Sequence, residues 1–171
     1  INVDADIVKS AGGATTLTLQ AGRDINLNGS ANSQEAVIKS TAGALNVVLE
    51  DGLASPDTTG YGAITLLKDI FTNGGSLTFG TEKSAGTYIG GTGTRTISTN
   101  GGALTFNGDT AFGNVEKAGS YDNAGLVIDT SKSDGTGGSV TFNGKLDSGN
   151  MYEYHAYTQA DEAAWAAIKE N

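Results

Sequence analysis

The chain contains no cysteine and a single histidine, His155, and both shortages restrict its chemistry. Without cysteine there are no disulfides, no thiol nucleophiles and no thiolate ligands for a metal ion. One histidine is too few to build a Cys/His metal cluster. The sequence therefore predicts neither a resident metal nor a cofactor.

Positive charge is also scarce: the chain has 10 Lys and Arg residues but 19 Asp and Glu residues, which gives a net charge of −9. A chain with this balance cannot neutralise a run of phosphates, so nucleic acid and anionic membrane surfaces are poor partners. No apolar stretch approaches the roughly 18 residues that a membrane helix needs, and we expect no membrane insertion. The first residues, 1–6, have neither a basic end nor a hydrophobic segment of the secretory kind. We interpret the chain as a section of a longer protein.

Proline occurs once, whereas glycine occurs 26 times. Glycine, threonine, serine and asparagine together fill roughly two fifths of the 171 positions. Because glycine costs roughly 1 kcal/mol at each position inside a helix, long helices are excluded over most of the chain. The apolar residues fall in short alternating runs, which is the pattern of half-buried strands. The sequence predicts one folded unit that is mostly β.

A repeat of about 30 residues organises these alternating runs. Segments 38–45, 70–77 and 97–104 align without gaps on the pattern I-x-[ST]-x-x-G-[AS]-L, and two looser copies flank them. A period of this length is close to one rung, or complete turn, of a coil with three strands. The anchors of five expected rungs are 27 to 32 residues apart: Val8, Ile38, Ile70, Ile97 and Ile128.

Each anchor is followed by a strand whose inward positions lie two residues apart. These positions predict core ladders made of Leu17/Leu19, Leu45/Val47, Leu77/Phe79, Leu104/Phe106 and Val140/Phe142. Five intervening residues are expected to face solvent: Thr18, Asn46, Thr78, Thr105 and Thr141. Further strands are expected over 24–29 and 62–66. Sharp corners are expected at Asn73–Gly75 and Asn100–Gly102, because glycine and asparagine tolerate a positive φ.

Two segments carry a resemblance to a known family. Residues 12–27, GGATTLTLQAGRDINL, and residues 100–108, NGGALTFNG, resemble the repeats of filamentous haemagglutinin-type large exoproteins. The resemblance covers residues 1–150 and implies an all-β fold, a right-handed parallel β-helix or β-solenoid of about five rungs. It also implies export across a Gram-negative envelope and a place in the shaft of a surface adhesin. The repeats of this family are scaffold, so no binding or catalytic residue is carried over.

Any specific contact is expected on the segments that depart from a plain repeat, because loops on a rigid scaffold often carry function. These segments are 50–61, 80–87 and 113–123. The candidate ligand-binding residues are the tyrosines in or near them: Tyr61, Tyr88 and Tyr121.

Two patterns suggest other chemistry, and a structural interpretation is favoured for both. Segment 90–97, GGTGTRTI, is close to the calcium-binding nonapeptide of β-rolls, but Arg95 stands where that motif has an aspartate. Three groups of acids could serve general acid–base catalysis: Asp4 with Asp6, Glu50 and Asp51 with Asp57, and Asp129 with Asp134. None of them repeats at the same place in the next rung, so solvated surface charge is favoured and no enzyme is predicted.

The composition changes after residue 150. Residues 151–157 are rich in tyrosine, and residues 158–170 begin with a capping box and favour a short helix. Ala164, Trp165 and Ile168 would form its apolar face. We interpret 151–171 either as a cap over the open end of the solenoid, near Val140 and Phe142, or as the start of another domain.

Together these observations predict a β-helical segment of a secreted or cell-surface adhesin. It would act by display and by binding a host or neighbouring cell surface, glycans included, without catalysis. Two alternatives stay open, a β-helix enzyme that acts on polysaccharide and a purely structural extracellular spacer. End-to-end self-association is a further candidate interaction, because an open solenoid exposes unpaired backbone N–H and C=O groups.

Overall fold

The computed structural model describes residues 1–29, 37–53, 62–81, 84–91, 93–113 and 125–147, and these residues form β-strands and no helix. Accordingly, the described segments hold no helix of the length and apolarity that a membrane crossing requires. The all-β character predicted from glycine and alternation is confirmed.

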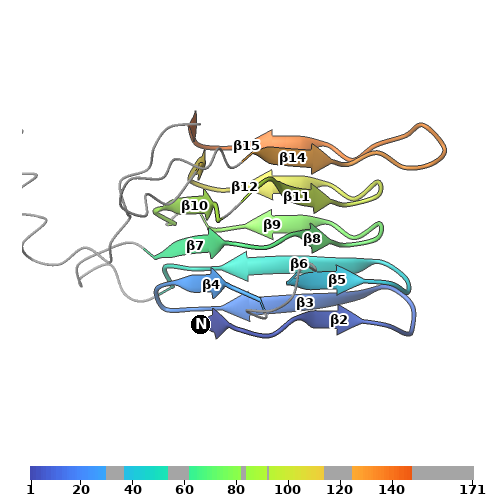
Figure 1. Cartoon of the computed structure of the whole chain (residues 1–171), viewed down its shortest axis with the longest axis horizontal. Helices are drawn as coiled ribbons and strands as arrows, with labels where there is room; N and C mark the ends of the chain where they lie inside the picture. Colours follow the sequence, from blue (N-terminus) through green and yellow to red (C-terminus); the bar gives the residue numbers. More distant parts are fainter. Residues whose placement is uncertain (30–36, 54–61, 82–83, 92, 114–124, 148–171) are drawn as a thin grey trace, which may run out of the picture.

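The strands form three parallel sheets that run side by side along the coil (Figure 1). Sheet A contains β1 (Asn2–Val3), β4 (Ile25–Leu27), β7 (Ala63–Leu66), β10 (Gly86–Ile89), β13 (Asp109–Phe112) and β16 (Leu146–Asp147). Sheet B contains β2 (Ile7–Lys9), β5 (Ile38–Ser40), β8 (Ile70–Phe71), β11 (Arg95–Ser98) and β14 (Leu126–Asp129). Sheet C contains β3 (Thr15–Gln20), β6 (Leu45–Glu50), β9 (Leu77–Phe79), β12 (Leu104–Phe106) and β15 (Val140–Phe142).

Every strand pairs with the strand three places along the chain, so three consecutive strands make one rung. The rungs are β1–β3, β4–β6, β7–β9, β10–β12 and β13–β15, and β16 adds one more strand to sheet A. This connectivity is that of a parallel β-solenoid, as the repeat predicted. The strands expected within 24–29 and 62–66 are β4 and β7.

The core consists of columns of identical or similar side chains, one from each rung. Ile38, Ile70 and Ile97 are in register and fully buried. In sheet C, the rings of Phe79, Phe106 and Phe142 stack nearly parallel, with 4.8 Å between the centroids of successive rings. This distance equals the spacing of hydrogen-bonded strands, so the aromatic stack and the backbone ladder reinforce each other.

The Ser/Thr and Gly of the repeat motif are joined by a hydrogen bond across the corner between sheets B and C. Thr72 Oγ1 donates to the carbonyl of Gly75 and Thr99 Oγ1 to that of Gly102, each at 2.5 Å. Ser40 and Thr130 make the corresponding bonds to Gly43 and Gly138. Thr72 and Thr99 are fully buried, so each hydroxyl satisfies a carbonyl that water cannot reach.

The glycines of this corner are required for two different reasons. Asn73 and Asn100 have φ values of 52° and 50°, and the glycines after them, Gly74 and Gly101, also have positive φ, which confirms the predicted corners. Gly102 has no such φ, but a Cβ there would overlap the carbonyl oxygen of Gly75 in the preceding rung. The corner backbones are therefore stacked as closely as their atoms allow.

The predicted anchor of the first rung, Val8, is wrong by one residue. Ile7 pairs with Ile38, whereas Val8 points outward and is 51% exposed. The reason is Lys9, which takes the inward corner position that serine or threonine holds in the other rungs. Its Nζ donates to the carbonyls of Ala11, Gly12 and Ala42, so an ammonium replaces the hydroxyl.

The predicted ladder partners in the second rung are wrong by two residues. Val47 and Leu49, and not Leu45 and Val47, pair with Leu17 and Leu19 and with Leu77 and Phe79. The corners of the first two rungs are longer and reach further sideways than those of the next two (Figure 1). Because a shift by two keeps the same face, Leu45 is still inward and buried, at 3% exposure.

The five residues predicted to face solvent are all exposed or half-buried, which confirms their orientation. The terminal rungs are more exposed than the middle of the stack: Val127 is 47% and Val140 is 41% exposed in the last. The helix predicted over 158–170, with its proposed packing on Val140, lies outside the described residues.

The close stacking of the corners leads to a test on stability. We expect Gly102→Ala to lower the free energy of unfolding by about 3 kcal/mol or more, because adjacent rungs must separate to admit the methyl group. The matched control is Gly13→Ala, at the corresponding corner of the first rung, where a Cβ meets nothing within 4 Å. The control should change stability by about 0.5 kcal/mol or less. Urea unfolding of both variants checks this, and equal losses would contradict it.

Candidate functional site

Tyr88, one of the three candidate tyrosines, lies on β10 and is half-buried. Its hydroxyl donates to the carbonyl of Gly113 at 3.1 Å, and burial raises the pKa of Tyr88. Its ring fills the space beside Gly90, where a Cβ would overlap the ring. Tyr88 thus joins the fourth rung to the end of β13.

The other two candidates, Tyr61 and Tyr121, lie outside the described residues. The same holds for most of the segments 50–61 and 113–123. These residues stay predictions.

The acids proposed as pairs are placed in separate structural roles. Asp4 accepts a hydrogen bond from Asn28 Nδ2 at 2.8 Å. Asp129 and Asp134 each accept from the backbone N–H and hydroxyl of the residue two positions later, and these bonds lower the pKa of both carboxyls. Glu50 accepts from Gln20 on the outer face of sheet C. Asp57 lies outside the described residues.

Among the acids that the structure describes, Asp51 alone is completely buried, at 0% exposure. It continues the inward alternation of Leu45, Val47 and Leu49 past the end of β6. Its Oδ2 accepts a hydrogen bond from Ser84 Oγ of the next rung at 2.7 Å, whereas its Oδ1 has no partner among the described residues. Burial raises the pKa of Asp51 to about 6, the hydrogen bond from Ser84 opposes that rise, and the charge of Asp24 adds to it.

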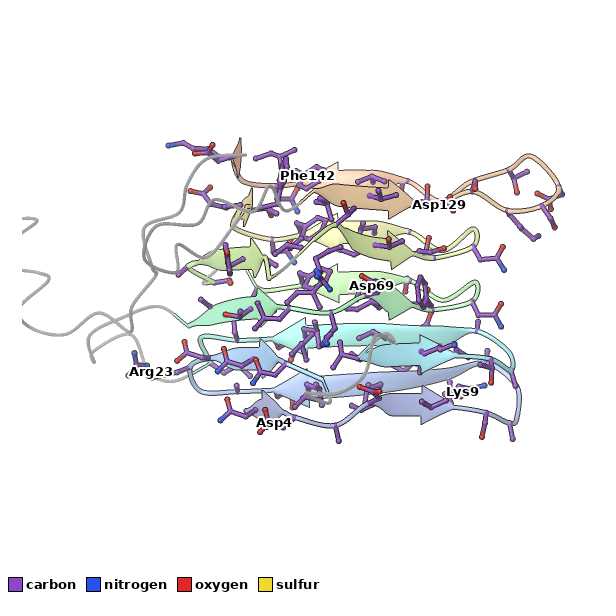
Figure 2. The ribbon with its side chains drawn as sticks, in the orientation of Figure 1. Asp4, Lys9, Arg23, Asp69, Asp129 and Phe142 are labelled. Carbon is purple, nitrogen blue, oxygen red and sulfur yellow. The ribbon has the colours of Figure 1, made fainter. Side chains whose placement is uncertain are left out.

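A polar hollow of about 550 Å³ opens at this same corner, between sheets C and A, in the first rung. Gln20, Arg23, Asp24 and Asn26 line it, and Figure 2 shows Arg23 at the end of the rungs opposite Lys9. Asp24 Oδ1 already accepts the backbone N–H of Ala63 at 3.2 Å. The hollow could therefore hydrogen-bond a polar ligand through the guanidinium and one carboxylate. Asp51 lies behind the surface, so this corner does not present two accessible acids for acid–base catalysis.

In the calcium-like segment 90–97, Gly91 and Gly93 have positive φ values and residues 95–97 belong to β11. The guanidinium of Arg95 lies beside these glycines, about 3.8 Å from where a Cβ of Gly91 would be. A cation placed there would meet a positive charge. In the described segments no three His, Cys, Asp or Glu side chains gather as metal ligands would.

The fifth rung replaces the tight corner by a projecting hairpin, residues 130–138, which lies in one of the two looser copies of the repeat (Figure 1). Ser131 and Gly137 form an antiparallel bridge, and Lys132 N–H donates to the carbonyl of Thr136 at 2.8 Å. Lys132 Nζ and Asp134 Oδ2 form an ion pair at 2.9 Å across the exposed tip. The hairpin is therefore an ordered feature with both signs of charge at its tip.

Comparison of this chain with known protein families, curated proteins and solved structures finds no match.

The buried carboxyl of Asp51 leads to a pH test. Its pKa is about 6 in the folded state against an ordinary value of 3.8, so folding favours the protonated form. The contribution of Asp51 to the free energy of unfolding is largest below about pH 4 and decreases as the pH rises to about 6. Above that pH the contribution is absent. We expect Asp51→Asn to be more stable than the parent above pH ~7 by about 2 kcal/mol and to lack this pH dependence.

Urea unfolding midpoints measured across this pH range check the prediction. The control is Glu50→Gln, which removes the neighbouring carboxylate on the outer face at the end of β6. It should retain the loss of stability between about pH 4 and about pH 6. A parent-like pH profile in Asp51→Asn would show that another group causes the effect.

Proposed function

We propose that this chain is a β-helical section of a secreted or cell-surface adhesin related to filamentous haemagglutinin-type exoproteins. The solenoid, right-handed in this proposal, acts as a stiff shaft, and the corners that depart from the repeat make contact with a cell surface. The mechanism is binding without turnover.

The observation that carries the proposal is the contrast between the regular rungs and the hairpin 130–138. The third and fourth rungs turn between sheets B and C through the short sequence [ST]-N-G-G, whereas the fifth extends a hairpin at the same place. A purely structural spacer would not need a hairpin in place of the tight corner. Internal hydrogen bonds order the hairpin before any partner arrives, which reduces the entropy lost on binding.

The outer face of sheet C supports a neutral polar partner such as a glycan. Its central row, in register from the first rung to the last, is uncharged: Thr18, Val48, Thr78, Thr105 and Thr141. Hydroxyl groups can both donate to and accept from sugar hydroxyls. With a net charge of −9, the chain favours neutral or basic surfaces over anionic ones.

Two other functions are supported less well. A polysaccharide-acting enzyme would need two accessible carboxylates in one groove, and the corner with Arg23 and Asp24 offers one. A purely structural spacer agrees with the regular ladders but leaves the hairpin without a role. End-to-end association belongs to the proposal as a further interaction of the shaft, and so does the role of residues 151–171 as a cap or as the start of another domain.

The test is binding to a broad glycan panel and to intact cells, with and without calcium. Three proteins are compared: the full chain, a version ending at Gly149, and a trimmed version in which residues 131–137 are replaced by Asn-Gly. The trimmed corner then reads T-N-G-G, as it does at residues 99–102. We expect trimming to weaken binding about tenfold or more, while truncation at Gly149 leaves binding intact.

The trimmed protein should keep the β-sheet circular dichroism and the urea midpoint of the parent, which separates lost contact from lost folding. Loss of binding only on truncation would place the contact after residue 149 and contradict the role of the hairpin. Absence of binding by all three proteins would contradict the adhesin and favour the spacer.

A further inference from the structure

Five asparagines of the described chain precede a glycine, and all of them stand at corners of the coil. The pairs are Asn28-Gly29, Asn73-Gly74, Asn100-Gly101, Asn107-Gly108 and Asn143-Gly144. An asparagine in this context can lose its side-chain amide without an enzyme, because the unhindered backbone nitrogen of glycine can attack the side-chain carbonyl carbon. The attacking nitrogen must first be free to give up its proton.

In three of the pairs the backbone N–H of glycine is held by a hydrogen bond to a neighbouring rung. Gly29 donates to Val3 at 2.9 Å, Gly74 to Thr99 at 2.6 Å and Gly101 to Thr130 at 3.0 Å, in each case to the backbone carbonyl. Attack by these nitrogens would first require one of the bonds that hold the rungs together to break.

The other two pairs lack this protection. The backbone N–H groups of Gly108 and Gly144 donate to no acceptor in the part of the chain that the structure describes. Both pairs also line one hollow of about 480 Å³, together with Asp109, so water can reach them.

Asn143 is less restrained than Asn107. Both polar atoms of the Asn107 side chain are hydrogen-bonded. Its Nδ2 donates to the carbonyl of Gly80, and its Oδ1 accepts from Asn143 Nδ2 at 2.8 Å. Asn107 is also half-buried, whereas Asn143 is exposed and is held only through its Nδ2. Asn143 therefore has to break one weakly protected bond before it can rotate towards the nitrogen of Gly144.

We propose that Asn143 is a site of spontaneous deamidation, with water as the only co-reactant. The Gly144 nitrogen forms a bond to Asn143 Cγ, the Cγ–Nδ2 bond breaks, and the proton from Gly144 leaves with the side-chain nitrogen as ammonia. Water then opens the resulting succinimide at either carbonyl, which gives aspartate or isoaspartate at position 143. No oxidation or reduction takes place.

The product changes the coil at this point. An aspartate has no Nδ2 donor for Asn107 Oδ1 and places a carboxylate against that oxygen, so the amide ladder from Gly80 through Asn107 loses its last bond. An isoaspartate also adds a backbone carbon between residues 143 and 144, close to Lys145, whose N–H and carbonyl bind Asp109 and Thr110. The modification therefore loosens the pairing of β16 with β13.

The experiment follows deamidation of the full folded chain at mildly alkaline pH and body temperature by peptide mass mapping. Asn143 should react about tenfold or more faster than Asn28, Asn73 and Asn100, since each of these must first lose a backbone hydrogen bond. Asn107 should fall between. The three protected pairs serve as controls within the same molecule and need no variant that might misfold.

Two further samples make the result decisive. In urea all five asparagines should react at similar rates, which shows that the fold causes the difference. In Asn143→Gln the fastest product should disappear while the rates at Asn28, Asn73 and Asn100 stay unchanged. Similar rates at all five positions in the folded chain would overturn the proposal, as would a first reaction at a protected pair or no reaction in the folded chain while the unfolded chain reacts.

Discussion

The distance between hydrogen-bonded rungs is the constraint on which the rest of this structure depends. Each rung is joined to the next by a parallel ladder in all three sheets, so paired strand residues lie above one another at about 4.8 Å. At that distance the phenylalanine rings stack, isoleucines form a column, and Gly75, Gly102 and Gly138 admit no Cβ. One repeated distance thus selects aromatic, β-branched and glycine residues at different places in the same motif.

The same repetition satisfies the polar groups at the corners. The hydroxyls of Thr72 and Thr99 turn inward to bind carbonyls, and asparagine side chains form ladders on the outside, with Asn100 donating to Asn73 and Asn143 to Asn107. At the first corner the ammonium group of Lys9, in place of a hydroxyl, donates to backbone carbonyls. A chain with few apolar residues can therefore form a well-ordered core, because the hydroxyls buried at these corners are paired with backbone carbonyls.

Function is expected where the repetition is interrupted. The hairpin 130–138 replaces a tight corner, the hollow beside Arg23 and Asp24 opens where the coil passes from sheet C to sheet A, and Asp51 introduces a carboxyl into the core. These three departures come from different rungs and do not form one catalytic centre. They suit a scaffold that presents separate contacts, and the burial of Asp51 makes one corner sensitive to pH.

The sequence by itself determined the coil of three strands per rung, the inward and outward residues from the second rung onward, and the tight corners at Asn73 and Asn100, because these follow from local alternation and from the repeat period. The sequence could not determine the register between the first two rungs, because corner length depends on how neighbouring rungs pack. The shift by two residues at Val47 also leaves the local alternation of inward and outward residues unchanged. The roles of Lys9 and Asp51 were likewise decided by tertiary structure. Whether a charged side chain lies outside or inside depends on partners from other rungs. For Lys9 the partner is the carbonyl of Ala42, and for Asp51 it is the hydroxyl of Ser84. Both partners are more than 30 residues away in the sequence.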